Sequence, residues 1–366
     1  MKILLTSMSL LPAYGGPAYS VSRLALALAD AGAEIGLWAS DQSATTTPLL
    51  AARPGLRCLV GDCAGAVAAF GKPDVLHDNG LWLRHNHSLA AIAARAGVPR
   101  VVSTRGMLEP WALRHKRLKK SAAWWLYQRH DLRRAQLLHA TAEQEVVNLE
   151  RLGLGVPVRM IPNGVDLPSR DGGGEARARA AEPRTALFVG RIYPVKGLLM
   201  LVEAWARVRP AGWRLKIAGP DEAGHRAEVE RAVMSAGLRN VVSFSGPLDD
   251  SAKSAAYFAA DLFVLPSHSE SFAMVVAEAL AHGLPVLTTT ATPWVRLAER
   301  RCGWSVAATA DGVAQGLQQA TALDSTTLRH MGGNGRAWVA ADFGWAAVAD
   351  RFLGAYEQIA ARGRSG

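Results

Sequence analysis

The sequence is poor in cysteine and has no long apolar run. Its three cysteines, Cys58, Cys63 and Cys302, are too few for a disulfide framework and lack the spacing of a zinc site. No stretch approaches the roughly 18 consecutive apolar residues that a membrane-spanning helix needs. A single lysine precedes a short apolar run at the N-terminus, which indicates a strand rather than a signal peptide. These absences favour a reduced, cytoplasmic compartment.

Acidic residues are in deficit, because 41 lysines and arginines face 31 aspartates and glutamates, for a net charge of +10. Much of the excess lies between Arg114 and Arg134, where eight basic residues accompany one acid. Tryptophans and a tyrosine are interleaved with them over 111–134. This pattern fits a helix lying on an anionic membrane surface. It also fits a solvated helix whose tryptophans are core residues, whereas no nucleic-acid-binding module is present.

The chain is long enough for two domains, and the same alternation of strands and helices occurs in two parts of it. Short β-branched runs alternate with helical stretches over 1–168, which predicts an α/β domain with a parallel sheet. A Gly-rich polar stretch over 169–184 is the predicted linker. The alternation resumes over 185–344, so we expect two doubly wound, Rossmann-like domains facing across a cleft. A final amphipathic run, 345–362, packs on one of them.

The most informative segment runs from Leu265 to Val286 and reads as strand, polar loop, helix and strand. Ser269 or Ser271 is expected to cap the helix, so that the amides over 272–275 form an anion site. Glu270 and Glu278 flank this site. Carboxylates on both sides of a diphosphate suit a ligand with hydroxyls at both ends, which is the anatomy of a nucleotide sugar.

Two cations follow the first strand of the second domain. Gly190-Arg191 lies at the strand end and Lys196 at the next helix start, where both charges are placed to neutralise a diphosphate. The turn after the next strand, Gly219-Pro220, is placed to flank the base of a nucleotide. Neither Asp-x-Asp nor a metal-ligand cluster is present, so we expect no metal or other cofactor.

Similar strand-end residues occur in the first domain. Gly15-Gly16 precede a helix start and let the backbone approach a ligand, although they do not form a dinucleotide fingerprint. His77, Asn79 and Arg105 also follow strands and are expected to face the same edge. A histidine at such a position is as readily a structural group as a catalyst.

Taken together, these motifs resemble the retaining family 4 glycosyltransferases of the GT-B fold, over essentially the whole chain. Arg105-Gly106-Met107-Leu108-Glu109-Pro110-Trp111 is similar to bacterial surface-polysaccharide enzymes of that family. The resemblance implies that the second domain binds a nucleotide diphosphate-sugar and the first an acceptor. It implies donor contacts, in addition to the residues above, from Ser271, Phe272, Ala273, Met274 and Val275. It also implies that the final helix returns to the first domain.

Two departures from the family pattern matter. Ser271 and Ala273 stand where the family usually has glycine, which narrows the sugar pocket. Arg105 stands where many members have histidine, so it cannot act as a base but can hold a phosphate or developing negative charge. The expected function is metal-independent, retaining transfer of a hexose-type sugar to a glycan or lipid-linked acceptor in polysaccharide or lipopolysaccharide synthesis. A nucleotide-sugar 2-epimerase and a non-catalytic nucleotide-sugar-binding protein remain as alternatives.

Overall fold

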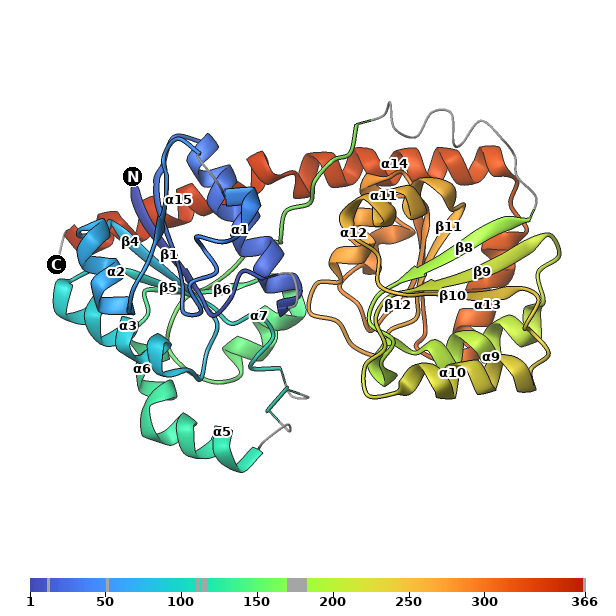
Figure 1. Cartoon of the computed structure of the whole chain (residues 1–366), viewed down its shortest axis with the longest axis horizontal. Coiled ribbons are helices and arrows are strands. Elements are labelled where there is room, and N and C mark those ends of the chain that lie inside the picture. The colour runs from blue at the N-terminus through green and yellow to red at the C-terminus, as the bar shows by residue number, and fades with distance from the viewer. Residues whose placement is uncertain (12–13, 51–52, 110–111, 114–116, 170–182, 365–366) are drawn as a thin grey trace. The chain divides into compact units, whose positions relative to one another are not determined.

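The computed structural model describes residues 1–11, 14–50, 53–109, 112–113, 117–169 and 183–364, and it divides into two compact units (Figure 1). Unit 1 comprises Met1–Gly164 with Trp345–Gly366, and unit 2 comprises Val165–Gly344. Most of the predicted linker, 170–182, lies outside the described residues. The C-terminal segment therefore belongs to the same unit as the N-terminus.

Unit 1 is built on a seven-stranded parallel sheet in the order β3-β2-β1-β4-β5-β6-β7. The strands are β1 (Lys2–Ser7), β2 (Glu34–Ala39), β3 (Leu56–Leu59), β4 (Val75–Asn79), β5 (Arg100–Ser103), β6 (Leu137–Ala140) and β7 (Val158–Met160). The helices are α1 (Gly16–Asp30), η2 (Pro48–Leu50), α2 (Cys63–Phe70), α3 (Arg84–Ala96), α5 (Arg117–Ala123), the π-helical turn η3 (Trp124–Gln128), α6 (Arg129–Arg133), α7 (Glu143–Glu150) and α15 (Trp345–Arg364).

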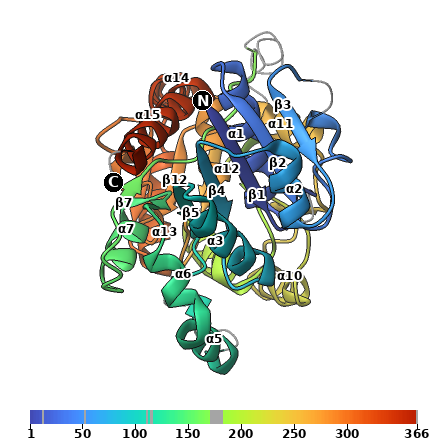
Figure 2. The ribbon, with the colours of Figure 1, turned by 90° about the vertical axis from the view of Figure 1, so that its left-hand side faces the viewer.

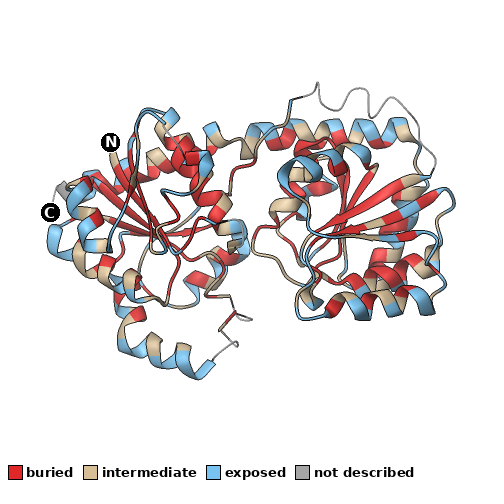
Figure 3. Cartoon of the chain, in the orientation of Figure 1, coloured by how far each residue is buried: buried red, intermediate tan, exposed pale blue. Residues whose placement is uncertain are grey.

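Helices cover both faces of this sheet, because alternate strand residues point to opposite sides. Ile3 and Leu5 of β1 pack in the cluster that contains residues of α1 and α15, whereas Leu4 packs in the cluster with α2 and α3. Figure 3 shows the strands buried and the outer faces of the helices exposed. The element α5 projects from the body of unit 1 in both views (Figures 1 and 2).

A buried hydrogen-bond chain ties α15 to the sheet. The hydroxyl of Tyr356 lies 2.6 Å from Nδ1 of His77, whose Nε2 lies 2.6 Å from Oγ of Ser103. That oxygen lies 2.6 Å from Nδ1 of His139, and Nε2 of His139 lies 2.7 Å from the carbonyl of Ile161. The carbonyl of Ile161 can only accept, so His139 donates to it and accepts from Ser103. His77 then donates to Ser103 and accepts from the hydroxyl of Tyr356.

The structure corrects the expectation that His77 faces the ligand-binding edge. Its side chain is completely buried, and both ring nitrogens are hydrogen-bonded within this chain. Burial lowers the pKa of His77 well below its usual 6.5, so the ring is neutral. The position of His77 therefore gives no support to a catalytic role and accounts for it as a structural residue.

Unit 2 has a six-stranded parallel sheet in the order β10-β9-β8-β11-β12-β13. The strands are β8 (Arg184–Val189), β9 (Trp213–Ala218), β10 (Val242–Ser245), β11 (Leu262–Leu265), β12 (Val286–Thr289) and β13 (Gly303–Val306). The helices are η5 (Pro194–Lys196), α9 (Leu198–Val208), α10 (His225–Ser235), α11 (Asp250–Ala259), α12 (Met274–Ala281), η6 (Val295–Leu297), α13 (Ala310–Thr321) and α14 (Ser325–Phe343). The prediction of two doubly wound parallel-sheet domains is confirmed.

Candidate active site

The strand order of unit 2 reverses between β8 and β11, and ligands of doubly wound sheets bind outside the strand ends at such a switch point. Gly190 and Arg191 directly follow β8, and the polar loop 266–273 directly follows β11. The two motifs that carry most of the predicted donor contacts therefore meet at the switch point.

Lys196 and Glu270 form an ion pair at this edge. Nζ of Lys196 lies 2.6 Å from Oε1 of Glu270, and their side chains are only 14% and 11% exposed. Oγ of Ser267 donates to the same carboxylate oxygen at 2.6 Å. Gly197 permits this approach, because a Cβ there would lie 2.1 Å from the carbonyl oxygen of Pro266. A largely buried cation thus lies in contact with a largely buried acid.

Two hydrogen bonds from β12 and the segment that follows it fix the loop 266–273. Oγ1 of Thr289 donates to the carbonyl of Ser267 at 2.5 Å, and Nε1 of Trp294 donates to the carbonyl of Phe272 at 2.6 Å. The ring of Phe272 is buried and packs on Trp294 at 5.5 Å between centroids. Phe272 therefore offers a ligand its backbone rather than its side chain.

The expectation of a serine cap on the following helix is wrong. The helix α12 begins at Met274, and its N-cap is Ala273 without a side-chain cap hydrogen bond. Ala273 has φ 60, a left-handed conformation that glycine adopts without strain. Ser269 and Ser271 lie before the cap, in the loop. The first-turn amides of α12, including those of Met274 and Val275, have no partner within the helix, as at every helix start.

Glu278 lies on α12 and is held by two residues that the sequence motifs did not indicate. Oε1 of Glu278 lies 3.0 Å from Nζ of Lys253, and Oε2 accepts a 3.0 Å hydrogen bond from Tyr257. Burial, with the charge of Glu278, raises the pKa of Tyr257 well above its usual 10, so the phenol remains a donor. Both partners come from α11, 21 and 25 residues away, and no spacing in the sequence marks them.

Arg191 is more exposed than Lys196 and pairs with Glu222. Its backbone is fixed by the neighbouring strand end, because the amide of Ile192 donates to the carbonyl of Pro220 at 2.8 Å. Only glycine fits at position 219, where a Cβ would lie 1.9 Å from the carbonyl oxygen of Gly190. The structure thus brings Pro220 beside the Arg191 segment, while the guanidinium is engaged away from Glu270.

The switch point of unit 1 lies between β1 and β4. Gly15 is the N-cap of α1 with φ 80, and a Cβ on Gly15 or Gly16 would meet nothing within 4 Å, so the backbone there is open. After β4, the side chain of Asn79 accepts from Nε and Nη2 of Arg105 at 3.2 and 2.6 Å. The residues predicted at this edge are therefore together, apart from His77.

Arg105 is a cation held by neutral acceptors. In addition to Asn79, its Nη1 donates to Oγ of Ser20 at 3.1 Å and to Oδ1 of Asn163 at 2.9 Å. Burial lowers the pKa of Arg105 to about 10, so it stays charged at neutral pH. Among the described residues no carboxylate forms an ion pair with it. Such a cation at a switch point is suited to an anionic group of a ligand.

The backbone at Arg105 has φ 52, and a buried carboxylate holds it there. Glu145 accepts hydrogen bonds from Oγ1 of Thr104 at 2.6 Å, the amide of Gly106 at 2.9 Å and the amide of Thr141 at 2.8 Å. Burial favours the neutral acid, but these hydrogen bonds outweigh it and lower the pKa of Glu145. Glu145 was not anticipated, since it follows a different strand.

Within the described ranges, no group of three or more His, Cys, Asp or Glu side chains is arranged to hold a metal ion. No helix searched there is long and apolar enough to cross a membrane.

The fold of this chain is similar to those of solved structures. Across 99% of this chain, the fold matches sucrose-phosphate synthase from Thermosynechococcus elongatus with a TM-score of 0.79 at 23% identity, covering all of that chain. Anabaena HepE in complex with UDP-glucose matches over 98% of this chain and all of its own, with a TM-score of 0.72 at 19% identity. The chain has the GT-B glycosyltransferase fold.

The sequence matches two glycosyltransferase family models. Residues 15–164 match the model described as "Glycosyl transferase 4-like domain", and residues 183–322 match "Glycosyl transferases group 1". A D-inositol 3-phosphate glycosyltransferase from Thermomonospora curvata is 30% identical over 81% of this chain and 76% of its own length. The GDP-mannose:cellobiosyl-diphosphopolyprenol alpha-mannosyltransferase of Xanthomonas campestris is 31% identical over 63% of this chain and 60% of its own length. The chain belongs to the family 4-like glycosyltransferases and is an enzyme of that class.

Proposed function

We propose that this glycosyltransferase moves a hexose-type sugar, with retention of configuration, from a nucleotide diphosphate-sugar to a lipid-linked or glycan acceptor of a bacterial surface polysaccharide or lipopolysaccharide. The observation that carries the proposal is the Lys196–Glu270 pair at the switch point of unit 2, directly before α12. The similarity to the Xanthomonas enzyme, whose name specifies a diphosphopolyprenol acceptor, supports the acceptor class.

In the donor complex, Lys196 and Arg191 neutralise the diphosphate, and the first-turn amides of α12 add hydrogen bonds to it. Glu270 exchanges its contact with Lys196 for hydroxyls of the sugar, while Glu278 accepts from the ribose hydroxyls. Gly190 and Pro220 flank the nucleotide, and Ala273 narrows the space around the sugar.

In the transfer step, the acceptor hydroxyl bonds to the anomeric carbon on the face from which the diphosphate departs. The acceptor proton passes to the departing diphosphate oxygen. The two cations stabilise the charge that develops there, so we expect the reaction to need no metal. Arg105 holds a phosphate of the acceptor, and the open backbone at Gly15-Gly16, at the start of α1, is suited to bind a phosphate of a ligand.

We propose that the enzyme acts in the cytoplasm, at the inner face of the membrane. The apolar and basic side chains that unit 1 exposes in one segment support contact with the membrane. Leu118, Leu126 and Trp125 are 86%, 81% and 72% exposed. Lys119 and Arg133 are exposed in the same segment. Trp111, Arg114 and Lys116 of the predicted segment 111–134 lie outside the described residues.

The membrane surface is tested by co-sedimentation with phosphatidylglycerol vesicles at low salt. The double variant Lys119→Glu/Arg133→Glu should sediment several-fold less than the wild type. The double variant Arg226→Glu/Arg231→Glu makes the same charge change in unit 2 and serves as the control. Equal sedimentation of all three proteins would rule out this surface.

The donor chemistry is tested by release of nucleoside diphosphate from a panel of nucleotide sugars, with and without acceptor. Glu278→Ala should weaken donor binding, whereas Arg191→Ala and Lys196→Ala should lower turnover more than binding. A chelator should leave the rate unchanged. The exposed Glu299→Ala is the control. Equal turnover in all variants would contradict these roles, and conversion of the sugar without acceptor would point to an epimerase instead.

A further inference from the structure

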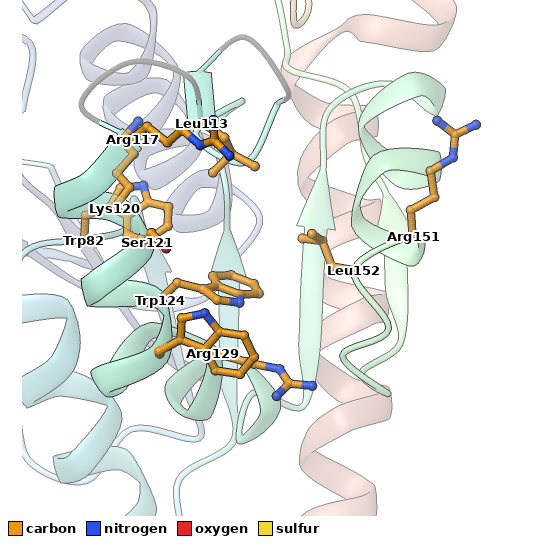
Figure 4. A pocket seen from close by; sticks show the side chains of 10 residues that line it. Trp82, Leu113, Arg117, Lys120, Ser121, Trp124, Arg129, Arg151 and Leu152 are labelled. Atoms are coloured by element: carbon orange, nitrogen blue, oxygen red, sulfur yellow. The ribbon is translucent and has the colours of Figure 1, made fainter.

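A cavity of about 670 Å³ lies in unit 1 (Figure 4). It lies among α5, the π-helical turn η3 and the loop after β4. Among the described residues, its lining combines three tryptophans, two leucines, a serine and four cations, without a carboxylate: Trp82, Leu113, Arg117, Lys120, Ser121, Trp124, Trp125, Arg129, Arg151 and Leu152. Apolar walls with only positive charge are complementary to an anion that carries hydrocarbon.

The backbone of one residue that lines the cavity is strained. Trp82 has φ 76, which is costly for a bulky residue and persists only where the surroundings enforce it. The hydroxyl of Tyr127 donates to the carbonyl of Trp82 at 2.6 Å, and the amide of Trp82 donates to Oε1 of Gln128 at 2.8 Å. Both partners belong to η3, and π-helical turns are frequent at functional sites.

The indole nitrogen of Trp82 gives a second sign of a ligand. Nε1 is buried and has no hydrogen-bond partner among the described residues. A buried N–H without an acceptor costs about 1–3 kcal/mol. Nζ of Lys120 lies 5.7 Å from the centre of the same ring. An anion in this cavity would lie beside an unsatisfied donor and the positive charge of Lys120.

We propose that this cavity binds the lipid diphosphate of the acceptor: the diphosphate against the cations of its lining, and the first hydrocarbon units against Trp82 and the leucines. This inference rests on the proposed function, because it names the acceptor of that reaction. A diphosphate carries more negative charge than the phosphodiester of an ordinary phospholipid, so it better matches several cations around one cavity.

The cavity also lies near the acceptor edge of unit 1. Trp82 is three residues beyond Asn79, which binds Arg105, so at most about 11 Å of chain separates Trp82 from Asn79. Leu113 follows β5 as Arg105 does. A lipid diphosphate in the cavity therefore leaves room for the sugar linked to it to extend toward Arg105.

Calorimetric titration of the full chain with farnesyl diphosphate tests this site. Arg117→Gln/Arg129→Gln should weaken binding at least tenfold, whereas the matched control Lys119→Gln/Arg133→Gln, which removes two charges from the same segment outside the cavity, should change it less than twofold. Inorganic pyrophosphate should bind the wild type at least tenfold more weakly than farnesyl diphosphate, and a soluble short-chain phosphatidylglycerol should not displace farnesyl diphosphate.

Equal loss in both double variants, or equal binding of pyrophosphate, would overturn the proposal. Displacement by short-chain phosphatidylglycerol would overturn it too, since the cavity would then bind ordinary phospholipid. The same samples are titrated with nucleoside diphosphates. Retained nucleotide binding without farnesyl diphosphate binding would refute this cavity alone, whereas absence of nucleotide binding would refute the proposed function.

Discussion

Replacing Ala273 with glycine should relieve strain at the start of α12. Ala273 has φ 60, and for residues other than glycine this left-handed conformation costs roughly 1–2 kcal/mol. The substitution also removes a buried methyl group and raises the conformational entropy of the unfolded chain. Its effect on the free energy of unfolding therefore does not measure the strain by itself. Ala277, four residues along the same helix, provides the comparison because it is buried as well.

Ala277→Gly makes the same chemical change in the interior of the helix. The lost methyl and the unfolded-state entropy are similar in the two variants, so their difference isolates the backbone strain. Ala273→Gly should therefore be more stable than Ala277→Gly by about 1–2 kcal/mol. For a domain of this size, each kcal/mol shifts the melting temperature by about 2–4 °C.

Differential scanning calorimetry of the full chain measures this difference, in the transition that both substitutions affect. Equal melting temperatures for the two variants would refute the assignment of a strained, glycine-like backbone at Ala273. The result bears on function, because this N-cap lies where the sugar of the donor is proposed to bind.

Three further predictions concern buried groups. Tyr356→Phe should cost about 1–3 kcal/mol in urea unfolding, because Nδ1 of His77 loses its hydrogen-bond partner; unchanged stability would contradict a stabilising role for this hydrogen bond. Burial lowers the pKa of His139 to about 4, below its unfolded value near 6.5, so its contribution is complete above pH 6.5 and is lost as the pH falls toward 4. Between pH 7 and 5.5 His139 alone should account for about 1 kcal/mol, and His139→Gln should flatten that part of the stability profile. Lys196→Met should destabilise unit 2 by about 2 kcal/mol, because it leaves the largely buried carboxylate of Glu270 without its cation. The double variant Lys196→Met/Glu270→Gln should recover at least half of this loss. Additive losses would show that the pair is not coupled.

The fold could be predicted from sequence because the strands of both sheets are buried on two faces and appear as short apolar runs. The alternation over 1–168 and 185–344 predicted a parallel sheet in each domain, as observed. The helix predicted within the basic segment 111–134 is interrupted by η3. A π-helical turn depends on tertiary contacts, here those of Tyr127 and Gln128 with Trp82, which periodicity does not record.

At the candidate site, local motifs indicated the residues after β8 and β11 but not their partners. Lys253 and Tyr257, which hold Glu278, come from a helix without a recognisable motif. The burial of His77 depends on Tyr356, 279 residues away in the chain. Such contacts arise only when the C-terminal helix packs on unit 1, so the strand-end position of His77 alone could not separate a structural role from a catalytic one.

The central claim is that the edge of unit 2 formed by the Lys196–Glu270 pair and the start of α12 binds a nucleotide diphosphate-sugar. Hydrogen–deuterium exchange of the full chain, with and without a nucleotide sugar that raises its melting temperature, tests this claim most directly. We expect slower exchange of backbone amides in peptides covering 190–197 and 267–278, with exchange over 310–343 unchanged. Protection elsewhere in unit 2 with no change in those two segments would contradict the account.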